Sequence, residues 1–179
     1  AQRVQWLRSI TDLQVNDALH VTNTFYVYDA QRDYKNVENY AFNASNTLIQ
    51  RSGGLLQRHD QRLVGNRLDG TYKGELGGKR SDWSFGLDLS LNTQTRFPTS
   101  TPNSFVVNVN PYDFTTGNFF GETGLTPGYN PDRTNKITTV AAYVENRTAL
   151  IPTLNLVTAL RIERIDLDLT NRRAISASA

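Results

Sequence analysis

Apolar and polar side chains alternate along much of the chain, most regularly between Ser81 and Thr95. Successive side chains of a β-strand point to opposite faces of a sheet, so strict alternation predicts a strand with one apolar and one polar face. The apolar positions are Trp83, Phe85, Leu87, Leu89 and Leu91, and the positions between them are Asp82, Ser84, Gly86, Asp88, Ser90 and Asn92. One face of this strand is therefore expected to contact apolar surroundings, and the other to contact water.

Five further stretches repeat the pattern less regularly and are also predicted to be strands. They are Val4–Gln14, Leu19–Val27, Val64–Tyr72, Val140–Arg147 and Leu156–Glu163. Asn23 interrupts the apolar face of the second stretch. In the first, Trp6 and Ile10 fall on one face whereas Leu7 and Leu13 fall on the other, so a β-bulge is expected there.

The connections between these stretches alternate in length. Val15–Asp17, Gly77–Arg80 and Ile151–Thr153 are short and contain residues that favour turns, whereas Ala30–Arg62 and Arg96–Lys136 are long. Outer-membrane β-barrels have short periplasmic turns and long extracellular loops. The pattern therefore predicts an all-β fold of antiparallel up-and-down strands of a transmembrane β-barrel, about six strands of a larger barrel, with long extracellular loops.

The two long connections are expected to differ in structure. In the first, Val37–Phe42 and Thr47–Arg51 flank the turn-forming stretch Asn43–Asn46, which predicts a hairpin above the membrane. The second contains many Pro and Gly residues and is expected to be irregular and exposed.

The composition permits a strand-built membrane wall but not a membrane-spanning helix. Mean hydropathy is −0.49, and the longest apolar run, Val140–Val144, is far shorter than the roughly 18 residues that a spanning helix needs. A barrel strand needs an apolar side chain only at every second position. Trp6 and Trp83 lie close to predicted turns and are expected in an interfacial aromatic belt. The net charge of +2, without blocks of like charge, does not indicate a nucleic-acid partner.

The sequence indicates no enzyme, so we predict no catalytic residue and no metal or other cofactor. Cysteine is absent, and no nucleophile or phosphate-loop motif is present. His20 and His59 are the only histidines, and their spacing does not match a metal site. His20 is expected at the lumen or the rim of the barrel.

Aromatic residues gather in and beside the two long connections, with occasional arginines among them. Exposed aromatic rings and a guanidinium group suit a bulky, anionic or catechol-like ligand, although such residues also pack loops internally. The predicted ligand-binding residues are Tyr28, Tyr34, Tyr40, Phe42, Arg96, Phe97, Tyr112, Phe114, Phe119, Phe120 and Tyr129.

Several stretches, in this order along almost the whole chain, resemble segments of the barrels of TonB-dependent siderophore receptors. They are Tyr28–Tyr34, Val37–Tyr40, Leu56–Gln61, Ser81–Asp88, Thr95–Ser100, Asn110–Phe114, Ala142–Arg147 and Leu156–Arg161. In the last segment Ala159 stands where the family pattern has glycine. The resemblance implies residues 1–179 to be a single segment of a 22-stranded barrel domain, with the plug and the closing strand absent from it.

This resemblance also implies a function and a location. The whole receptor is expected to capture and import ferric siderophores in the outer membrane of a Gram-negative bacterium, in contact with lipid. Its TonB complex would act through parts of the receptor not present in this chain. The alternative is a soluble or surface-displayed β-domain that binds carbohydrate or another ligand without catalysis. The two differ in one respect: Phe85, Leu87, Leu89 and Leu91 should be exposed in a barrel wall and buried between two sheets in a sandwich.

Overall fold

The computed structural model describes residues 2–100, 105–113, 119–122 and 130–172. They form one sheet with the strand order β1-β2-β3-β4-β6-β7, and β5 pairs with β3 beside this path. The elements are β1 (Gln2–Gln14), β2 (Leu19–Phe42), β3 (Ile49–Leu76), β4 (Lys79–Ser100), β5 (Val107–Val109), α1 (Phe119–Glu122), β6 (Arg133–Ile151) and β7 (Leu154–Asn171). All the pairings are antiparallel, so the predicted all-β class and the up-and-down strand order are confirmed.

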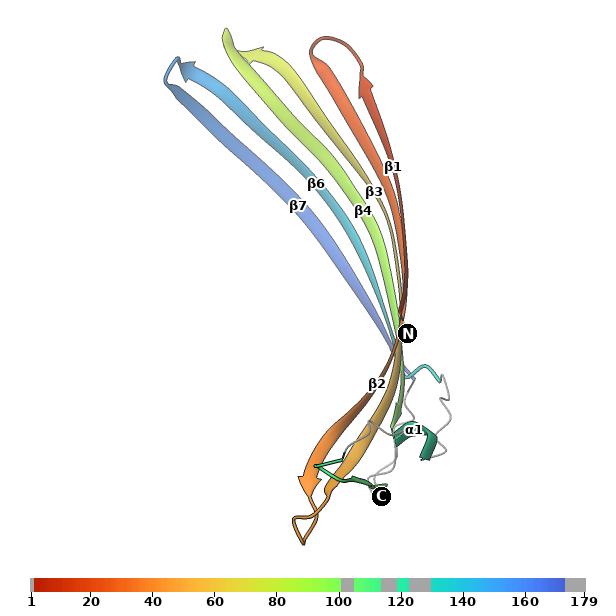
Figure 1. The fold of residues 1–179 in the computed structure, drawn as a ribbon. Coiled ribbons are helices and arrows are strands. Elements are labelled where there is room, and N and C mark those ends of the chain that lie inside the picture. Colours follow the sequence, from red (N-terminus) through yellow and green to blue (C-terminus); the bar gives the residue numbers. More distant parts are fainter. Residues whose placement is uncertain (1, 101–104, 114–118, 123–129, 173–179) are drawn as a thin grey trace, which may run out of the picture.

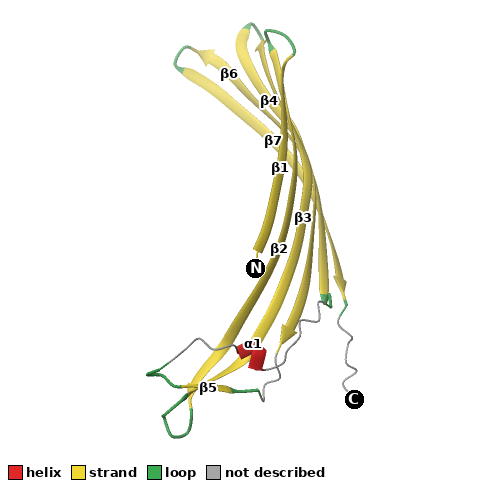
Figure 2. Cartoon of the chain, turned by 45° about the vertical axis from the view of Figure 1, so that its right-hand side comes forward, coloured by secondary structure: helices red, strands yellow, loops and turns green. Residues whose placement is uncertain are grey.

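The sheet is open and strongly curved, and its two ends differ (Figure 1). The tight turns β1–β2, β3–β4 and β6–β7 lie together at one end, which we call the turn end. The β2–β3 connection, β5 and α1 lie at the other end, which we call the loop end (Figure 2).

The first long connection is mostly strand, so the prediction of a loop over Ala30–Arg62 is wrong. β2 and β3 pair without interruption of register from Leu19↔Tyr72 to Phe42↔Ile49, and only Asn43–Leu48 separates them. The predicted hairpin about Asn43–Asn46 is confirmed as the tip of this long ladder. Alternation fades here because both faces are polar, whereas backbone pairing does not need an apolar face.

Local side-chain and backbone chemistry explains the turns. Gly77 and Gly78 link β3 to β4 with φ angles of 60° and 72°, the left-handed conformation that a two-residue hairpin turn needs and that glycine adopts most easily. At the β1–β2 turn, the side-chain oxygen of Asn16 accepts hydrogen bonds of 2.9 Å from the backbone N–H groups of Ala18 and Leu19. These turns determine which residues pair in each hairpin.

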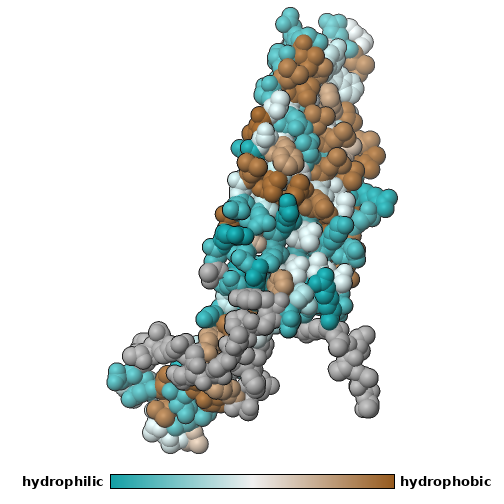
Figure 3. All heavy atoms as spheres, turned by 90° about the vertical axis from the view of Figure 1, so that its right-hand side faces the viewer, coloured by the Kyte–Doolittle hydropathy of each residue, from teal (hydrophilic) through white to brown (hydrophobic). Residues whose placement is uncertain are grey.

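One face of the sheet carries an apolar belt in its turn-end half, and we call it the belt face. Cross-strand partners share a face, so the register aligns Phe85, Leu87, Leu89 and Leu91 of β4 mainly with apolar residues of β1, β2, β3 and β6. On β7 the belt includes only Leu160 and Ile162, because Arg164 and Asp166, which form an ion pair, occupy the rows of Leu89 and Leu91. The other members of the belt are Leu7, Leu13, Val21, Phe25, Val27, Val64, Leu68, Val140, Ala142, Val144, Leu160 and Ile162. Figure 3 shows such a band over one face, with hydrophilic residues nearer the loop end.

The belt is uncovered in the described part of the chain. Phe85, Leu87, Leu89 and Leu91 are 37%, 50%, 49% and 38% exposed. The expectation that these four side chains would be exposed is therefore confirmed, and no second sheet packs on them among the described residues.

Apolar side chains change face toward the loop end. On the opposite face, which we call the charged face, the register aligns Trp6, Tyr28, Leu63, Ile137 and Leu167 in one cross-strand row. The pairing of β1 with β2 is continuous, so the expected β-bulge is wrong, and Trp6 simply belongs to this row. Trp6 packs edge-on against Tyr28 at 5.4 Å, away from the turn, whereas Trp83 shares the belt face with Phe85 near the turn end.

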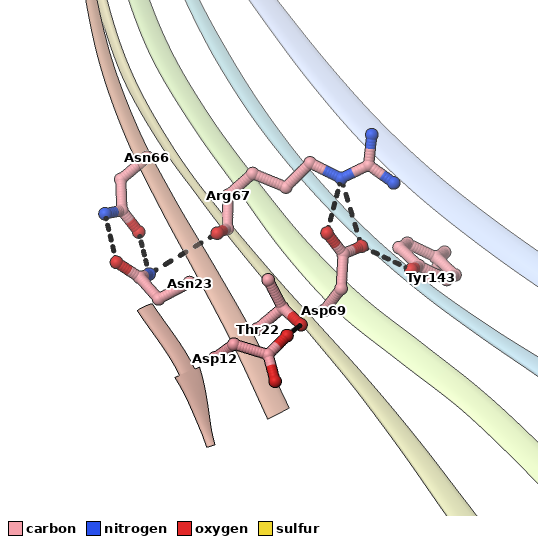
Figure 4. A network of polar contacts seen from close by, with 7 residues as sticks. All are labelled: Asp12, Thr22, Asn23, Asn66, Arg67, Asp69 and Tyr143. Carbon is pink, nitrogen blue, oxygen red and sulfur yellow. Dashed lines mark hydrogen bonds and ion pairs between the residues drawn. The ribbon is translucent and has the colours of Figure 1, made fainter. Parts of the chain in front are cut away.

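On the charged face, a polar network crosses the sheet within its turn-end half (Figure 4). The Tyr143 hydroxyl on β6 donates a 2.6 Å hydrogen bond to Asp69 on β3, and Asp69 forms a 2.9 Å ion pair with Arg67. Gly86 of β4 lies between Asp69 and Tyr143 in the register. A Cβ atom on Gly86 would lie 2.3 Å from the Tyr143 ring, so the absence of a side chain lets Tyr143 reach across β4.

The polar interruption of the belt at Asn23 is internally satisfied. The Asn23 and Asn66 amides exchange hydrogen bonds of 2.8 and 3.1 Å between β2 and β3 (Figure 4). A mutually paired amide costs much less in apolar surroundings than an unpaired one.

We expect Gly86→Ala to destabilise the sheet by about 1–3 kcal/mol, the usual cost of overpacking. The added methyl group would meet the Tyr143 ring and also lie 2.7 Å from the backbone oxygen of Leu68. Chemical unfolding of the protein expressed from its complete reading frame would measure the loss. Ser84→Ala, on the same face of β4, is the matched control, and an equal effect of both substitutions would contradict this account.

Candidate functional site

Four basic side chains occupy one cross-strand row of the charged face near the loop end. Arg32 on β2 pairs with His59 on β3, His59 pairs with Arg96 on β4, and Arg96 pairs with Arg133 on β6. We call these four residues the basic row. Directly opposite side chains lie about 4.5–5.5 Å apart at Cβ, so the row is one compact group rather than scattered charges.

Only one of the three arginines has a described carboxylate partner. Arg96 donates hydrogen bonds of 3.1 and 2.6 Å to the two oxygens of the buried Asp132 carboxylate. This bond raises the pKa of Arg96 above its already high ordinary value. The backbone N–H of Asp132 also bonds the Arg96 carbonyl at 3.0 Å, which holds the start of β6 against β4.

His59 is half-buried at the centre of the row. Burial lowers the pKa of its imidazole below the ordinary value of 6.5, and the neighbouring Arg32 and Arg96 charges lower it further, against the opposing effect of Asp132. The ring of Tyr34 lies edge-on to His59 at 6.1 Å, and the Arg32 guanidinium lies 5.0 Å from the same ring. The Tyr34 hydroxyl in turn donates a hydrogen bond to Gln57.

An open depression of about 250 Å³ lies over this part of the sheet. Besides His59, Arg96 and Arg133, it is lined by the amide side chains of Gln57, Gln94 and Asn135. The apolar row that contains Trp6, Tyr28 and Leu167 lies four residues farther along the strands toward the turn end. The depression therefore combines positive charge and hydrogen-bonding amides, with aromatic surface nearby.

The predicted ligand-binding residues divide into distinct groups. Tyr34 and Arg96 come together in the basic-row site, and Tyr28 lies on the same face in the nearby apolar row. Phe97 points to the belt face, where its ring lies 5.4 Å from the Arg58 guanidinium. Tyr40, Phe42 and Tyr112 are exposed at the loop end and do not join the site.

Two other predicted residues pack within the loop end. Phe119 of α1 is 4% exposed and contacts the rings of Phe105 and Phe120 at 5.6 and 5.3 Å. The Phe120 ring also lies 5.6 Å from the Lys35 amine. Phe114 and Tyr129 lie outside the described residues. Participation of all these residues in ligand binding stays a prediction.

Sequence reasoning missed Arg32, His59 and Arg133. Their signal was the register: a tight turn at Gly77–Gly78 aligns His59 with Arg96, and the turn after Phe42 aligns Arg32 with His59. His20, expected at the lumen or rim, lies on the charged face and its ring bonds Asp12 at 2.7 Å.

The described residues contain neither a candidate metal site nor a membrane-spanning helix. Among them, no group of three or more His, Cys, Asp or Glu side chains is arranged to hold a metal ion. No helix within the described ranges is both long and apolar enough to cross a membrane.

Comparisons with known proteins show the fold only. The sequence matches no protein-family model and no curated protein. Among solved structures, the chain is similar to BauA, the ferric preacinetobactin receptor from Acinetobacter baumannii, with a TM-score of 0.72 and 14% sequence identity. The match covers 94% of this chain and 25% of the BauA chain, so this chain spans a quarter of the length of that receptor. At this identity the likeness supports the all-β up-and-down architecture and leaves the family open.

We expect Arg32→Gln to raise the pKa of His59 toward its ordinary value, because it removes a neighbouring positive charge. The lowered pKa also affects stability. Below about pH 6.5 the unfolded chain binds a proton at His59 more readily than the folded chain, so the free energy of unfolding decreases as pH falls from about 6.5 toward the lower pKa of the folded state. Histidine-selective NMR titration, with the signal assigned through His59→Gln, would measure the His59 titration midpoint in the wild type and in Arg32→Gln. Arg62→Gln, on the belt face of β3, should leave the midpoint unchanged, whereas an identical midpoint in the wild type and Arg32→Gln would refute the electrostatic cause.

Proposed function

We propose that the chain is a wall segment of an outer-membrane β-barrel receptor of the TonB-dependent siderophore class. In this proposal the belt face contacts lipid, the charged face lines the lumen, and the loop end lies outside the cell. The loop end would help to capture a ferric siderophore. Energy from TonB would reach the receptor through a plug and a TonB-contacting segment elsewhere in the receptor. The segment itself would act in binding, not catalysis.

The uncovered apolar belt is the observation that carries this proposal. Soluble proteins rarely leave an apolar surface of this extent exposed to water. In β4 the belt extends from Trp83 to Leu91, which is about the 9–11 residues that a tilted strand needs to cross the hydrocarbon layer. Trp83 and its cross-strand partner Tyr72 share the belt face at the turn end of this stretch, where interfacial aromatic side chains occur in barrels.

Strand length supports the same orientation. β2 and β3 contain 24 and 28 residues and continue well past the belt toward the loop end. Loopward of the belt, Asp29, Arg62 and Lys136 occupy the belt face, so that face is polar where it would leave the membrane. The similarity to BauA, a ferric preacinetobactin receptor, agrees with this assignment at the level of fold.

The alternative, a soluble or surface-displayed carbohydrate-binding β-domain, requires a cover for the belt. Among the described residues one sheet is present and both of its edge strands, β1 and β7, have their outer edges unpaired. Unpaired edges and an uncovered belt are both accounted for if further strands continue the wall on either side.

We expect Leu89→Arg to impair assembly of the receptor by about 2–4 kcal/mol, the cost of an arginine on the lipid face near the membrane midplane. Asp88→Asn, on the adjacent position of the charged face, should have a mild effect. Equilibrium unfolding in lipid vesicles would measure both changes, and the folded fraction in isolated outer membranes would check them in cells. Equal losses for the two variants would contradict the assignment of the faces.

Ligand capture requires its own experiment. Cells that express the complete reading frame, grown under iron limitation, should bind iron-labelled siderophores above the level of cells without it. Fractionation should place the protein in the outer membrane. Recovery of the protein in a soluble fraction, fully folded, would favour the alternative.

A further inference from the structure

We propose that the basic row is an anion-binding site, which makes the receptor selective for negatively charged ferric chelates over neutral ones. The ligand atoms that it would take are carboxylate or catecholate oxygens. This inference rests on the proposed function for the identity of the ligand as a ferric chelate, whereas the anion site itself rests on the placement of the four basic residues beside the depression.

Charge pairing in the rest of the sheet sets the row apart. Basic residues elsewhere commonly face an acid directly across the ladder, and the described pairs are Asp29↔Arg62, Asp33↔Arg58, Arg67↔Asp88, Lys73↔Asp82, Glu75↔Arg80, Asp82↔Arg147 and Lys136↔Asp168. In the described register only Arg96↔Arg133 places two permanently charged residues of like sign opposite each other. Like charges directly opposite destabilise a sheet. The other basic residues of the described register face an acid or a neutral residue, so the register differs at this one row.

The row has an uncompensated charge even after its internal ion pair is counted. Three guanidinium groups against the single carboxylate of Asp132 leave a formal excess of two positive charges when His59 is neutral. Asp132 is engaged by Arg96, and the side chain of Arg133 is exposed beside the depression. An anion in the depression would meet Arg133 and His59 together with amide groups that can donate hydrogen bonds.

The surroundings favour an organic anion over a small inorganic one. Tyr34 stands beside His59 on the loop side, and the row that contains Tyr28 and Trp6 stands on the turn side. The Tyr34 ring beside a positive centre suits a ligand that carries its charge on an aromatic or chelating framework.

His59 makes the site sensitive to pH. The charged or titratable groups around it are Arg32 and Tyr34 of β2, Arg96 of β4, and Asp132 and Arg133 at the start of β6. A bound anion would favour the protonated imidazole, so binding should take up a proton and strengthen as pH falls. His59→Gln should reduce this pH dependence without abolishing binding, since the arginines remain.

The test measures dissociation constants for the detergent-solubilised protein, expressed from its complete reading frame, with three probes. These are a negatively charged ferric catecholate, a neutral ferric hydroxamate, and iron-free citrate. We expect the catecholate to bind at least about tenfold more tightly than the hydroxamate. Arg133→Gln should weaken catecholate binding about 10- to 100-fold, which is the range for losing a hydrogen bond to a charged group. Arg32→Gln should weaken it less, because Arg32 does not line the depression and acts on the anion only through its charge.

Matched variants separate this effect from general damage. Arg62→Gln removes the same charge from the belt face of β3, three residues from His59, and should leave all three constants unchanged. Arg133→Lys should retain most of the binding if charge alone matters. Added salt should weaken catecholate binding by the wild type more than by Arg133→Gln, because the variant has less charge to screen.

The outcomes distinguish a failure of charge selectivity from a failure of the receptor proposal. Binding of the hydroxamate as tightly as the catecholate, or equal catecholate binding by Arg133→Gln, Arg32→Gln and Arg62→Gln, would overturn charge selectivity while leaving the receptor proposal intact. If neither ferric chelate binds, the receptor proposal fails and citrate decides the rest. Citrate binding that is lost in Arg133→Gln would then support an anion site for another ligand. No citrate binding would overturn the site.

Discussion

The register of the backbone ladder is the constraint on which this structure depends. From β2 through β4 the register stays constant, with only the pair of Glu38 and Gly53 missing from the ladder, and the one register shift described in the sheet lies between Ala149 and Ile151 at the turn end of β6. A shift of one residue in any strand would exchange its two faces. Such a shift in β4 would move Leu87 and Leu89 to the charged face and Asp88 to the belt. Both the belt and the basic row therefore exist only in this register.

Each face then meets a different requirement. On the belt face the polar side chains bond to each other, as Asn23 and Asn66 do, which lowers the cost of placing an amide among apolar neighbours. On the charged face the side chains bond across strands, and Tyr143 reaches Asp69 only because Gly86 leaves space between them. Gly86 and Tyr143 thus act together, because the Tyr143 ring occupies the space that a side chain at position 86 would fill.

Much of the fold follows from local patterns, and its limits have physical causes. Alternation identifies β4 and locates the belt because the belt needs an apolar side chain at every second position. It does not show how far β2 and β3 continue, since a ladder with two polar faces carries no hydrophobic period. It also misleads in β1, where Trp6 and Leu7 both belong to apolar rows, but on opposite faces at different heights. The predicted bulge is therefore absent, and the pairing of β1 is regular.

The basic row shows the same limit at the level of the site. Two of its cross-strand pairings follow from the positions of the hairpin turns. The turn after Phe42 pairs Arg32 with His59, and the turn at Gly77–Gly78 pairs His59 with Arg96. The third does not, because a long connection separates Arg96 from Arg133 and its length does not determine their alignment. Yet that third contact is the one that opposes two permanent charges. Outside the basic row, every basic residue of the described register faces an acid or a neutral residue, so the arginine at position 133 is best explained by a requirement outside the folded chain.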